Sequence, residues 1–381
     1  MLKVQRRGTK AKPKRRAALA QVGGRVDLWL CPAFSVEHQK IRMAPGIYSV
    51  ILQNAQFFDF KGDGEMEERK GADIEEKTQK VGLVVEGGAM RGMFTAGVMD
   101  VFLDHDFFPD AVMGVSSGAV FASSYISGQR GRVIRYSRRF NADKRYMGLG
   151  SLIKTGNYIN RDFAYGSVQW ELDPFDEEAF EKRGIPFYLV TTDIGLGEPV
   201  YVRMTNMMKQ NDYLIATASM PFFSKPVKID GREYLDGGFT DAVPYMKMKE
   251  MGYEKLIILL TREKGYEKKG LPPALVKAFY HKNKNLCHIL INYHEDYNEN
   301  FRRMERMEEA GELFVIRPPE ALKIKRVEKD PKKLQMGYDL GVRTGEDRFK
   351  DLMKFLGKPI SDQEGQNPKI QGKAGSCPAP A

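Results

Sequence analysis

Residues 81–97 read VGLVVEGGAMRGMFTAG, and residues 111–120 read AVMGVSSGAV. Each stretch begins with a short apolar run, passes through glycine or serine, and continues with apolar residues at helical spacing. A strand, a tight turn and a helix are therefore expected in both. Repetition of this unit predicts an α/β fold with a mainly parallel sheet.

The rest of the chain continues the alternation. We expect strands at 81–86, 111–114, 186–193, 200–204, 233–236, 255–261 and 313–317, and helices at 89–105, 118–126, 212–220, 277–299 and 332–356. Helices on both faces of such a sheet give a three-layer α/β/α architecture. Ligands bind beyond the carboxyl ends of its strands, which is where Ser116, Gly87-Gly88 and Asp236 are predicted to lie.

Ser116 is the candidate nucleophile. It lies in a G-x-S-x-G pattern between a predicted strand and a predicted helix. The turn of a nucleophile elbow is so sharp that its flanking residues must be small, and Gly114 and Gly118 meet that need. The helix that follows offers its positive end to a developing oxyanion. The alternative is a glycine-serine turn without chemistry, but the strand before it and the helix after it favour the elbow.

An acyl-transfer serine also needs donors for the oxyanion. The stretch GGAMRG follows a strand and opens a helix, and its small residues let backbone amides approach a substrate oxygen. The alternative is a dinucleotide-binding loop, G-x-G-x-x-G. That pattern fits poorly because Ala89 stands where the second glycine is required, and the chain has no P-loop motif.

A general base must accept the serine proton. No histidine lies in a turn-like loop after a strand; the five are His38, His105, His281, His288 and His294. Asp236 ends a predicted strand instead, and Gly237 and Gly238 after it allow another backbone to come close. Asp236 is therefore the candidate base, acting directly on the hydroxyl. The alternative is an ordinary turn.

Taken in order, EGGAMRG, GVSSG and DGG resemble the patatin-like phospholipase family. The similarity extends to IPFYLVTTDIGLGEPVYV, ATASMPFFSKPV and RPPEALKIKRVEKDPKKL, and so covers residues 79–357. The resemblance implies a patatin-like fold and a Ser–Asp dyad without histidine, formed by Ser116 and Asp236. It also implies an oxyanion loop made of Gly87, Gly88, Ala89, Arg91 and Gly92. Ala89 departs from the family's third loop glycine, and its methyl group fits only if φ stays negative.

Charge and composition separate the chain into parts. Of the net charge of +10, residues 1–25 carry nine basic residues and no acid. This basic arm could bind RNA or an anionic membrane, or be a solvated tail. We expect residues 1–78 to be a disordered extension or an over-extended start, with translation beginning at Met66. Residues 79–250 are the expected catalytic core, 251–357 the C-terminal part of the same unit, and 358–381 a disordered tail.

Two further segments carry a basic charge beside apolar residues. Residues 130–146 hold seven basic residues, and Arg135, Arg138 and Arg139 share a helix face that could dock lipid phosphates. The alternative is a solvated helix face. Residues 264–284 mix lysines with Leu271, Val276, Phe279 and Tyr280. They could lie in a membrane interface, but a surface helix whose apolar side meets the core is the favoured interpretation.

The sequence thus predicts a serine hydrolase that cleaves carboxylic esters of lipids without a metal or organic cofactor. Three dispersed cysteines and the lack of a long apolar run fit a cytoplasmic protein, in contact at most with the inner face of an anionic membrane. Nucleic acid is not an expected partner. Two alternatives stay open: an α/β-hydrolase whose triad uses His281, His288 or His294, and a non-catalytic lipid- or RNA-binding protein.

Overall fold

The computed structural model describes residues 21–22, 25–26 and 79–358, and the chain separates into two units, 1–75 and 76–381. In the first unit, β1 (Gln21–Val22) pairs antiparallel with β2 (Arg25–Val26). Apart from these four residues, the predictions made for the basic arm, for a start at Met66 and for the tail after residue 358 lie outside the described residues.

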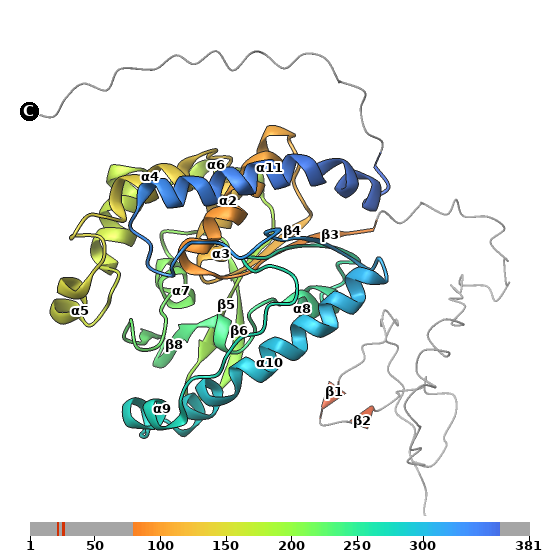
Figure 1. Ribbon diagram of the computed structural model, residues 1–381. Helices are drawn as coiled ribbons and strands as arrows, with labels where there is room; N and C mark the ends of the chain where they lie inside the picture. The colour runs from red at the N-terminus through yellow and green to blue at the C-terminus, as the bar shows by residue number, and fades with distance from the viewer. Residues whose placement is uncertain (1–20, 23–24, 27–78, 359–381) are drawn as a thin grey trace, which may run out of the picture. The chain divides into compact units, whose positions relative to one another are not determined.

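The second unit is built on an eight-stranded sheet (Figure 1). Its main order is β10-β9-β3-β4-β5-β8-β7, and β6 pairs with β5. The first five strands in that order are parallel, whereas β6, β7 and β8 join by antiparallel pairing. The strands are β3 (Val81–Val85), β4 (Ala111–Val115), β5 (Phe187–Asp193), β6 (Glu198–Met204), β7 (Val227–Ile229), β8 (Arg232–Asp236), β9 (Lys255–Leu259) and β10 (Leu313–Ile316).

Helices cover both faces of the sheet (Figure 1). The α-helices are α2 (Met93–Asp104), α3 (Ser117–Ile126), α4 (Arg132–Phe140), α5 (Leu149–Thr155), α6 (Glu177–Arg183), α7 (Asn211–Thr217), α8 (Tyr245–Glu250), α9 (Pro273–Tyr280), α10 (Lys284–Glu309) and α11 (Pro331–Phe355). Two 3₁₀ turns, η1 (Ala89–Gly92) and η3 (Gly237–Phe239), and a π-helix, η2 (Asp162–Leu172), complete the described elements. None of the helices in the described residues is long and apolar enough to cross a bilayer.

The strands are apolar on both faces because two cores sandwich them. Leu83 and Val85 of β3 join one core with α2, α3 and α11, whereas Val84 between them joins the other core with α8 and α10. All three side chains are fully buried. Continuous apolar runs are typical of parallel strands covered on both sides. The α/β/α architecture with a mainly parallel sheet is thereby confirmed.

Helix α11 packs closely on α2, along the top of the view in Figure 1. Glycines make this approach possible: a Cβ atom on Gly97 would clash with the carbonyl oxygen of Tyr338, and one on Gly341 with that of Phe94. The last helix of the described chain is thus held against the helix that follows the glycine-rich loop.

Two predicted helices differ from the observed ones. The helix expected at 277–299 is two helices, α9 and α10, because Asn283 adopts a non-helical conformation and its side chain accepts a hydrogen bond from the Leu286 amide at 2.9 Å. Such an asparagine caps the start of a new helix. The helix expected at 89–105 begins as the 3₁₀ turn η1. Between β4 and β5, helices α5 and α6 and the π-helix η2 were not predicted.

The pairing of β5 brings two strand ends together. Strand β6 pairs with all seven residues of β5 on one edge. The other edge is shared, because β4 pairs with residues 187–190 and β8 with residues 191–193. The ends of β4 and β8 therefore meet at the boundary between Val190 and Thr191. Strand β8 is antiparallel to β5, so it reaches this boundary from the direction opposite to that of β4.

Candidate active site

Ser116 occupies a strained turn between β4 and α3. Its backbone has φ 54° and ψ −130°, an unusual conformation for a residue with a side chain, and it is only 8% exposed. The Ser116 amide donates to Thr217 Oγ1 at 3.0 Å, and that hydroxyl donates to the Val190 carbonyl at 2.6 Å. Thr217 thus fixes the elbow. The sequence analysis did not single it out, because a threonine near the end of a short helix carries no local signal.

The motif glycines are required by close contacts. A Cβ atom on Gly87 would lie 2.6 Å from Ser116 Cβ and 2.8 Å from the Val115 carbonyl oxygen. One on Gly114 would lie 2.5 Å from Ala119 Cα, and one on Gly118 would meet the Val85 carbonyl oxygen. These separations are shorter than real Cβ contacts. The glycine-rich loop, the elbow and the end of β3 can therefore pack this closely only with glycine at these positions.

Asp236 contacts Ser116 directly. Ser116 Oγ donates to Asp236 Oδ2 at 2.6 Å, and the Gly238 amide donates to Asp236 Oδ1 at 2.8 Å. Gly237, which follows Asp236, has no room for a side chain, because an added Cβ atom would clash with the Val190 carbonyl oxygen. Asp236 is 4% exposed, and this burial raises the pKa of its carboxyl to about 6, while the bonds from Ser116 and Gly238 act in the opposite direction. A carboxylate with a pKa near neutrality is suited to accept and return a proton.

The glycine-rich loop lies against Ser116, with two differences from expectation. The Gly88 amide donates to Ser117 Oγ at 3.0 Å, so in this state it is committed to a side chain. Ala89 has φ 50°, in the left-handed region, whereas we expected a negative φ. Left-handed geometry costs an alanine about 1 kcal/mol. The turn of the loop fixes this conformation, and the alanine methyl group is accommodated there.

The expected loop residues separate into two groups. Gly87, Gly88, Ala89 and Arg91 line a cavity together with Ser116. Gly92 does not line it; a Cβ atom there would lie 2.7 Å from the Phe121 ring, so this glycine serves packing between η1 and α3.

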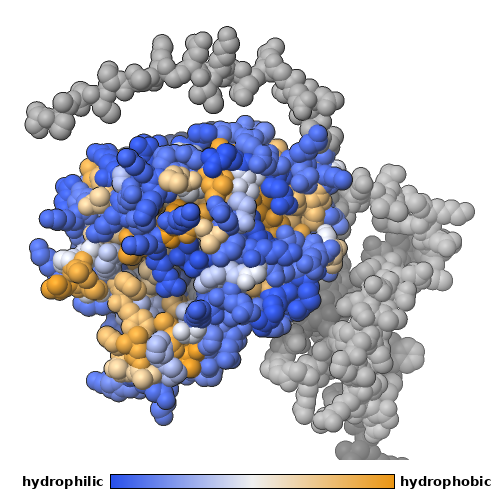
Figure 2. All heavy atoms as spheres, viewed as in Figure 1, coloured by the Kyte–Doolittle hydropathy of each residue, from blue (hydrophilic) through white to orange (hydrophobic). Residues whose placement is uncertain are grey.

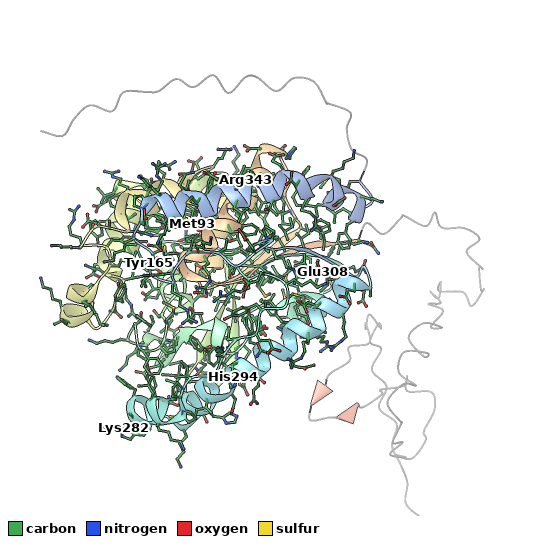
Figure 3. The ribbon with its side chains drawn as sticks, in the orientation of Figure 1. Met93, Tyr165, Lys282, His294, Glu308 and Arg343 are labelled. Atoms are coloured by element: carbon green, nitrogen blue, oxygen red, sulfur yellow. The ribbon has the colours of Figure 1, made fainter. Side chains whose placement is uncertain are left out.

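Two cavities meet at Ser116. The apolar cavity, of about 880 Å³ including space open to solvent, lies between α3, α4 and η2. Its walls include Val120, Phe121, Tyr136, Met147, Tyr165 and Val168. Tyr165 is among the side chains labelled in Figure 3. A mostly apolar hollow with a few polar groups is typical of a site for an apolar ligand.

The polar cavity, of about 600 Å³ including space open to solvent, is lined by Gly87, Gly88 and Ala89 of the glycine-rich loop. Ser116, Ala89, Met220 and Arg326 belong to both cavities. Its remaining walls include Glu86, Arg91, Asp236, Arg262, Tyr266, Lys268, Tyr293 and Tyr297. Of these, the sequence analysis gave a role only to Arg91 and Asp236. Glu86 opens the glycine-rich motif, and the others come from distant segments with no motif.

The histidines lie away from Ser116 in the described part of the chain. His105 pairs with Glu346 at the end of α2, and His281 follows α9. His288 and His294 lie on α10, where Figure 3 labels His294. Neither cavity at Ser116 is lined by any of these four residues. His38 lies outside the described residues.

The basic face of α4 does not line either cavity. Arg135 forms a two-pronged ion pair with Asp173, with both N–O distances at 2.8 Å. Arg138 donates to Gln335 at 2.9 Å, and Arg139 donates to the Leu172 carbonyl at 3.1 Å. Arg135 is thus neutralised within the protein, and docking of lipid phosphates by this face stays a prediction.

The segment 264–284 places apolar side chains on both sides of α9. Val276 is fully buried and packs with Leu286 and Leu290, whereas Phe279 is 65% exposed. On α5, Leu149 and Ile153 are also exposed. Figure 2 shows apolar side chains gathered over this part of the surface.

No group of three or more His, Cys, Asp or Glu side chains within residues 79–358 could hold a metal ion.

Comparisons with known proteins match the part of the chain that holds this site. The family model described as patatin-like phospholipase matches residues 83–248, which hold both Ser116 and Asp236, and a domain of unknown function (DUF6363) matches residues 283–357. The protein YjjU of Escherichia coli K12 is 31% identical over 188 residues, which is 48% of this chain and 52% of YjjU. Lysophospholipase NTE1 of Debaryomyces hansenii is 26% identical over 184 residues, which is 47% of this chain and 12% of that protein.

Among solved structures, VipD from Legionella pneumophila matches with a TM-score of 0.36 at 10% identity, over 77% of this chain and 71% of that one. This chain spans about half of YjjU and a small part of NTE1. The range matched by the phospholipase family model contains the elbow, the glycine-rich loop and the DGG turn. Residues 83–248 thus match the model of the patatin-like phospholipase family, the family that the sequence motifs resemble.

Proposed function

We propose that this protein hydrolyses carboxylic esters of lipids with Ser116 as nucleophile and Asp236 as general base. The observation that carries the proposal is the 2.6 Å hydrogen bond from Ser116 Oγ to Asp236 Oδ2, at the point where an apolar and a polar cavity meet. A nucleophile within hydrogen-bond distance of its base is the geometry that activates a serine hydroxyl.

The reaction runs in two halves. Asp236 accepts the Ser116 proton while Oγ bonds to the acyl carbon, and the carbonyl oxygen becomes an oxyanion. The intermediate collapses, the bond from the acyl carbon to the ester oxygen breaks, and Asp236 returns the proton to the leaving alcohol. Water then attacks the acyl-enzyme, Asp236 accepts the water proton, and Ser116 leaves with that proton as the fatty acid forms. The start of α3 and the loop at Ala89 supply the positive end and the amides that stabilise the oxyanion.

The two cavities suggest how a lipid ester binds at Ser116. An acyl chain fits the apolar cavity, because removal of its methylene groups from water favours binding. The leaving alcohol then faces the polar cavity across Ser116. The name of one relative, lysophospholipase, describes an enzyme that acts on such an ester. A lipid ester is therefore the proposed substrate.

A catalytic triad is the rival mechanism. It requires one of His281, His288 and His294 to contact Asp236 or Ser116, yet in the described residues the Asp236 oxygens are bonded by Ser116 and Gly238. Replacement of these histidines one at a time is expected to change activity less than threefold. A loss of about 10³-fold at any of them, typical of a lost base, would favour the triad.

We further propose that the protein acts in the cytoplasm and touches the membrane peripherally. Exposed Phe279 on α9 and Ile153 on α5 support this, because such side chains partition into a membrane interface. Co-sedimentation with neutral and anionic vesicles tests it. Binding by wild type that is weakened in a Phe279→Ser, Ile153→Ser variant is the expected result, and equal recovery of both proteins would contradict the proposal.

Turnover of esters tests the proposed chemistry. Wild type is expected to hydrolyse lipid esters, and Ser116→Ala and Asp236→Asn are each expected to lower kcat/KM by about 10³-fold or more. Ser127→Ala is the matched control, because this buried serine at the end of α3 bonds only to nearby residues and lines neither cavity. Equal activity of all four proteins would contradict the proposal.

A further inference from the structure

Glu86, the residue before the two loop glycines, is a buried carboxylate that the proposed chemistry does not use. It directly follows β3 and is 3% exposed. Its Oε2 accepts hydrogen bonds from the Thr261 amide at 2.6 Å and the Thr261 hydroxyl at 2.9 Å, and its Oε1 accepts one from the Tyr297 hydroxyl at 2.7 Å. A buried carboxylate is costly unless hydrogen bonds replace its water. Three donors therefore hold this charge in one orientation.

Thr261 extends this contact to the glycine-rich loop. Its hydroxyl lies 3.3 Å from the Gly87 carbonyl oxygen, and a Cβ atom on Gly88 would lie 2.5 Å from the same hydroxyl. On the other side, a Cβ atom on Gly87 would lie 2.6 Å from Ser116 Cβ. The first half of the loop is thus wedged between the elbow and Thr261, and the Glu86 carboxylate holds Thr261 in place.

Tyr297 of α10 is itself held firmly. It is 5% exposed, and its ring stacks on that of Phe301 with 4.4 Å between the centroids. Lys268 Nζ lies 3.4 Å from the centroid of the Tyr297 ring. The backbone of Lys268 is fixed in turn, because its amide donates to Asn298 Oδ1 at 2.7 Å and its carbonyl accepts from Asn298 Nδ2 at 3.0 Å. These contacts leave the Tyr297 hydroxyl at one position, bonded to Glu86.

A second contact holds the other half of the loop. The Met90 amide donates to the Arg326 carbonyl at 3.2 Å. The segment that carries this carbonyl is ordered by Glu328, whose Oε1 accepts from the Lys329 amide at 3.1 Å and the Asp330 amide at 3.2 Å. The loop is therefore fixed on both sides.

The amide of Ala89 lies between these fixed points. The Gly88 amide before it donates to Ser117 Oγ, and the Met90 amide after it donates to the Arg326 carbonyl. Ala89 lines both cavities and belongs to the part of the loop that stabilises the oxyanion in the proposed mechanism. A donor of this kind works only when it is aimed at the place where charge develops, so a small displacement lowers the rate.

Both contacts come from the C-terminal region. Tyr297 and Arg326 lie within residues 283–357, the range that matches a domain of unknown function, whereas the loop lies within residues 83–248. Figure 1 shows α10 and α11 of this region on opposite faces of the sheet, and each belongs to a different core. The C-terminal region thus reaches the loop from outside the matched phospholipase range.

We propose that residues 283–357 serve to hold the glycine-rich loop in its working position, and that Glu86 and Tyr297 are positioning residues for the oxyanion. The inference rests on the proposed function, because the oxyanion forms on an ester attacked by Ser116. A hydrogen bond to a carboxylate suits this role, since it is stronger than a neutral one. Without the Tyr297 hydroxyl, one buried oxygen of Glu86 loses its donor, and Glu86 must shift with the loop.

Tyr297→Phe tests the inference, because it removes one hydroxyl and keeps the ring. On a lipid ester, kcat is expected to fall about tenfold or more while KM stays within about twofold of wild type, since the loop acts on the oxyanion of the transition state. Glu86→Gln is expected to give the same result. A wild-type kcat in Tyr297→Phe would overturn the inference. A raised KM with unchanged kcat would assign these residues to substrate binding and also overturn it.

Tyr338→Phe is the matched control. The Tyr338 hydroxyl of α11 donates to Asp100 Oδ2 of α2 at 2.6 Å, and each residue is 7% exposed. The substitution therefore removes the same kind of bond between a buried tyrosine and a buried carboxylate, but neither residue lines a cavity at Ser116. Its kcat should stay within about twofold of wild type. An equal loss of kcat in Tyr338→Phe and Tyr297→Phe would attribute the effect to a weakened fold and overturn the inference.

A double variant tests whether Tyr297 acts through Glu86. If the two residues form one contact, Glu86→Gln and Tyr297→Phe together should lower kcat by no more than about threefold beyond the larger single effect. Single effects that multiply would show two separate roles and overturn the shared contact.

Hydrogen exchange, followed by mass spectrometry, measures the loop without turnover. The peptide with residues 86–92 is expected to exchange about tenfold faster or more in Tyr297→Phe than in wild type, and within about threefold of wild type in Tyr338→Phe. Unchanged exchange in Tyr297→Phe would overturn the inference even if wild type is active. Absence of turnover in wild type together with the expected difference in exchange would instead contradict the proposed function.

Discussion

Ser116 Oγ lies 2.6 Å from Asp236 Oδ2, although 120 residues separate them in the chain. The contact arises because Val115, which precedes the serine, pairs with Val190 of β5, and Asp236 pairs with the next residue, Thr191. Strands β4 and β8 thus lie end to end along one edge of β5 and bring the Ser116 hydroxyl and the Asp236 carboxylate together. The buried sheet holds this distance fixed.

Activity should rise with pH through about 6. Asp236 must be ionised to accept the serine proton, and its pKa is raised to about 6 by burial. We therefore predict that kcat/KM falls about tenfold per pH unit well below pH 6 and is level from about pH 7 to 8. The measurement is a pH profile on an uncharged ester. A profile that is level down to pH 4.5 would show that no group with this pKa acts as the base.

Asp236→Asn should make the protein more stable at neutral pH. The carboxyl has a pKa near 3.8 when unfolded and about 6 when folded, so its ionisation favours the unfolded chain. This destabilisation is absent below pH 3.8, grows up to pH 6, and is fully present above it, where it amounts to about 3 kcal/mol. Urea unfolding at pH 7.5 and pH 4 measures it.

The stability gain should be present at pH 7.5 and largely lost at pH 4. Asp347→Asn, at an exposed position of α11, is the control and should change the free energy of unfolding by less than about 0.5 kcal/mol. An Asp236→Asn protein that is less stable than wild type at pH 7.5 would show that its hydrogen bonds outweigh the cost of burying the charge.

Gly87→Ala should lower activity strongly while the protein stays folded. The added Cβ atom would lie 2.6 Å from Ser116 Cβ, so the loop or the serine must move. A displacement of about 1 Å at a reacting atom costs about 10²-fold in rate, and we predict at least that loss in kcat/KM. In Gly150→Ala the new methyl group meets no atom within 4 Å, and activity should be unchanged. Full activity of Gly87→Ala would contradict the close approach of the loop to Ser116.

Ala89→Gly should stabilise the protein slightly. Ala89 has φ 50°, a conformation that glycine adopts without strain, and its replacement should raise the free energy of unfolding by up to about 1 kcal/mol. Ala278→Gly, at an exposed site in α9, should instead lower it by about 1 kcal/mol, because glycine is unfavourable within a helix. Urea unfolding compares the two, and destabilisation by both substitutions would contradict the assigned backbone conformation.

Local patterns sufficed to predict the strands and their polar ends. Apolar runs marked β3 and β4, and the spacing of glycines around Ser116 indicated the elbow, because these features depend on neighbours in the sequence. The break at Asn283 was missed because the apolar spacing continues across it, and only the capping bond shows where one helix ends. The left-handed Ala89 was missed because its φ is set by the loop.

The polar cavity could not be predicted in the same way. Lys268 lies in a segment without a motif, and the quoted segment that contains Arg326 gave that residue no role. Tertiary hydrogen bonds hold both: Asn298 of α10 bonds to the backbone of Lys268, and the Met90 amide donates to the Arg326 carbonyl. Thr217 is similar, since its role depends on the Val190 carbonyl of a neighbouring strand. Residues that act through tertiary contacts leave no periodic signal for a sequence pattern to detect.

The most direct measurement is covalent labelling with a fluorophosphonate, followed by identification of the labelled peptide. Such a probe reacts with a serine only when a base activates it. Our account predicts one label on Ser116 in wild type and in Ser127→Ala, and none in Ser116→Ala or Asp236→Asn. A folded wild type that stays unlabelled, or an Asp236→Asn variant that labels at the wild-type rate, would contradict the Ser116–Asp236 dyad.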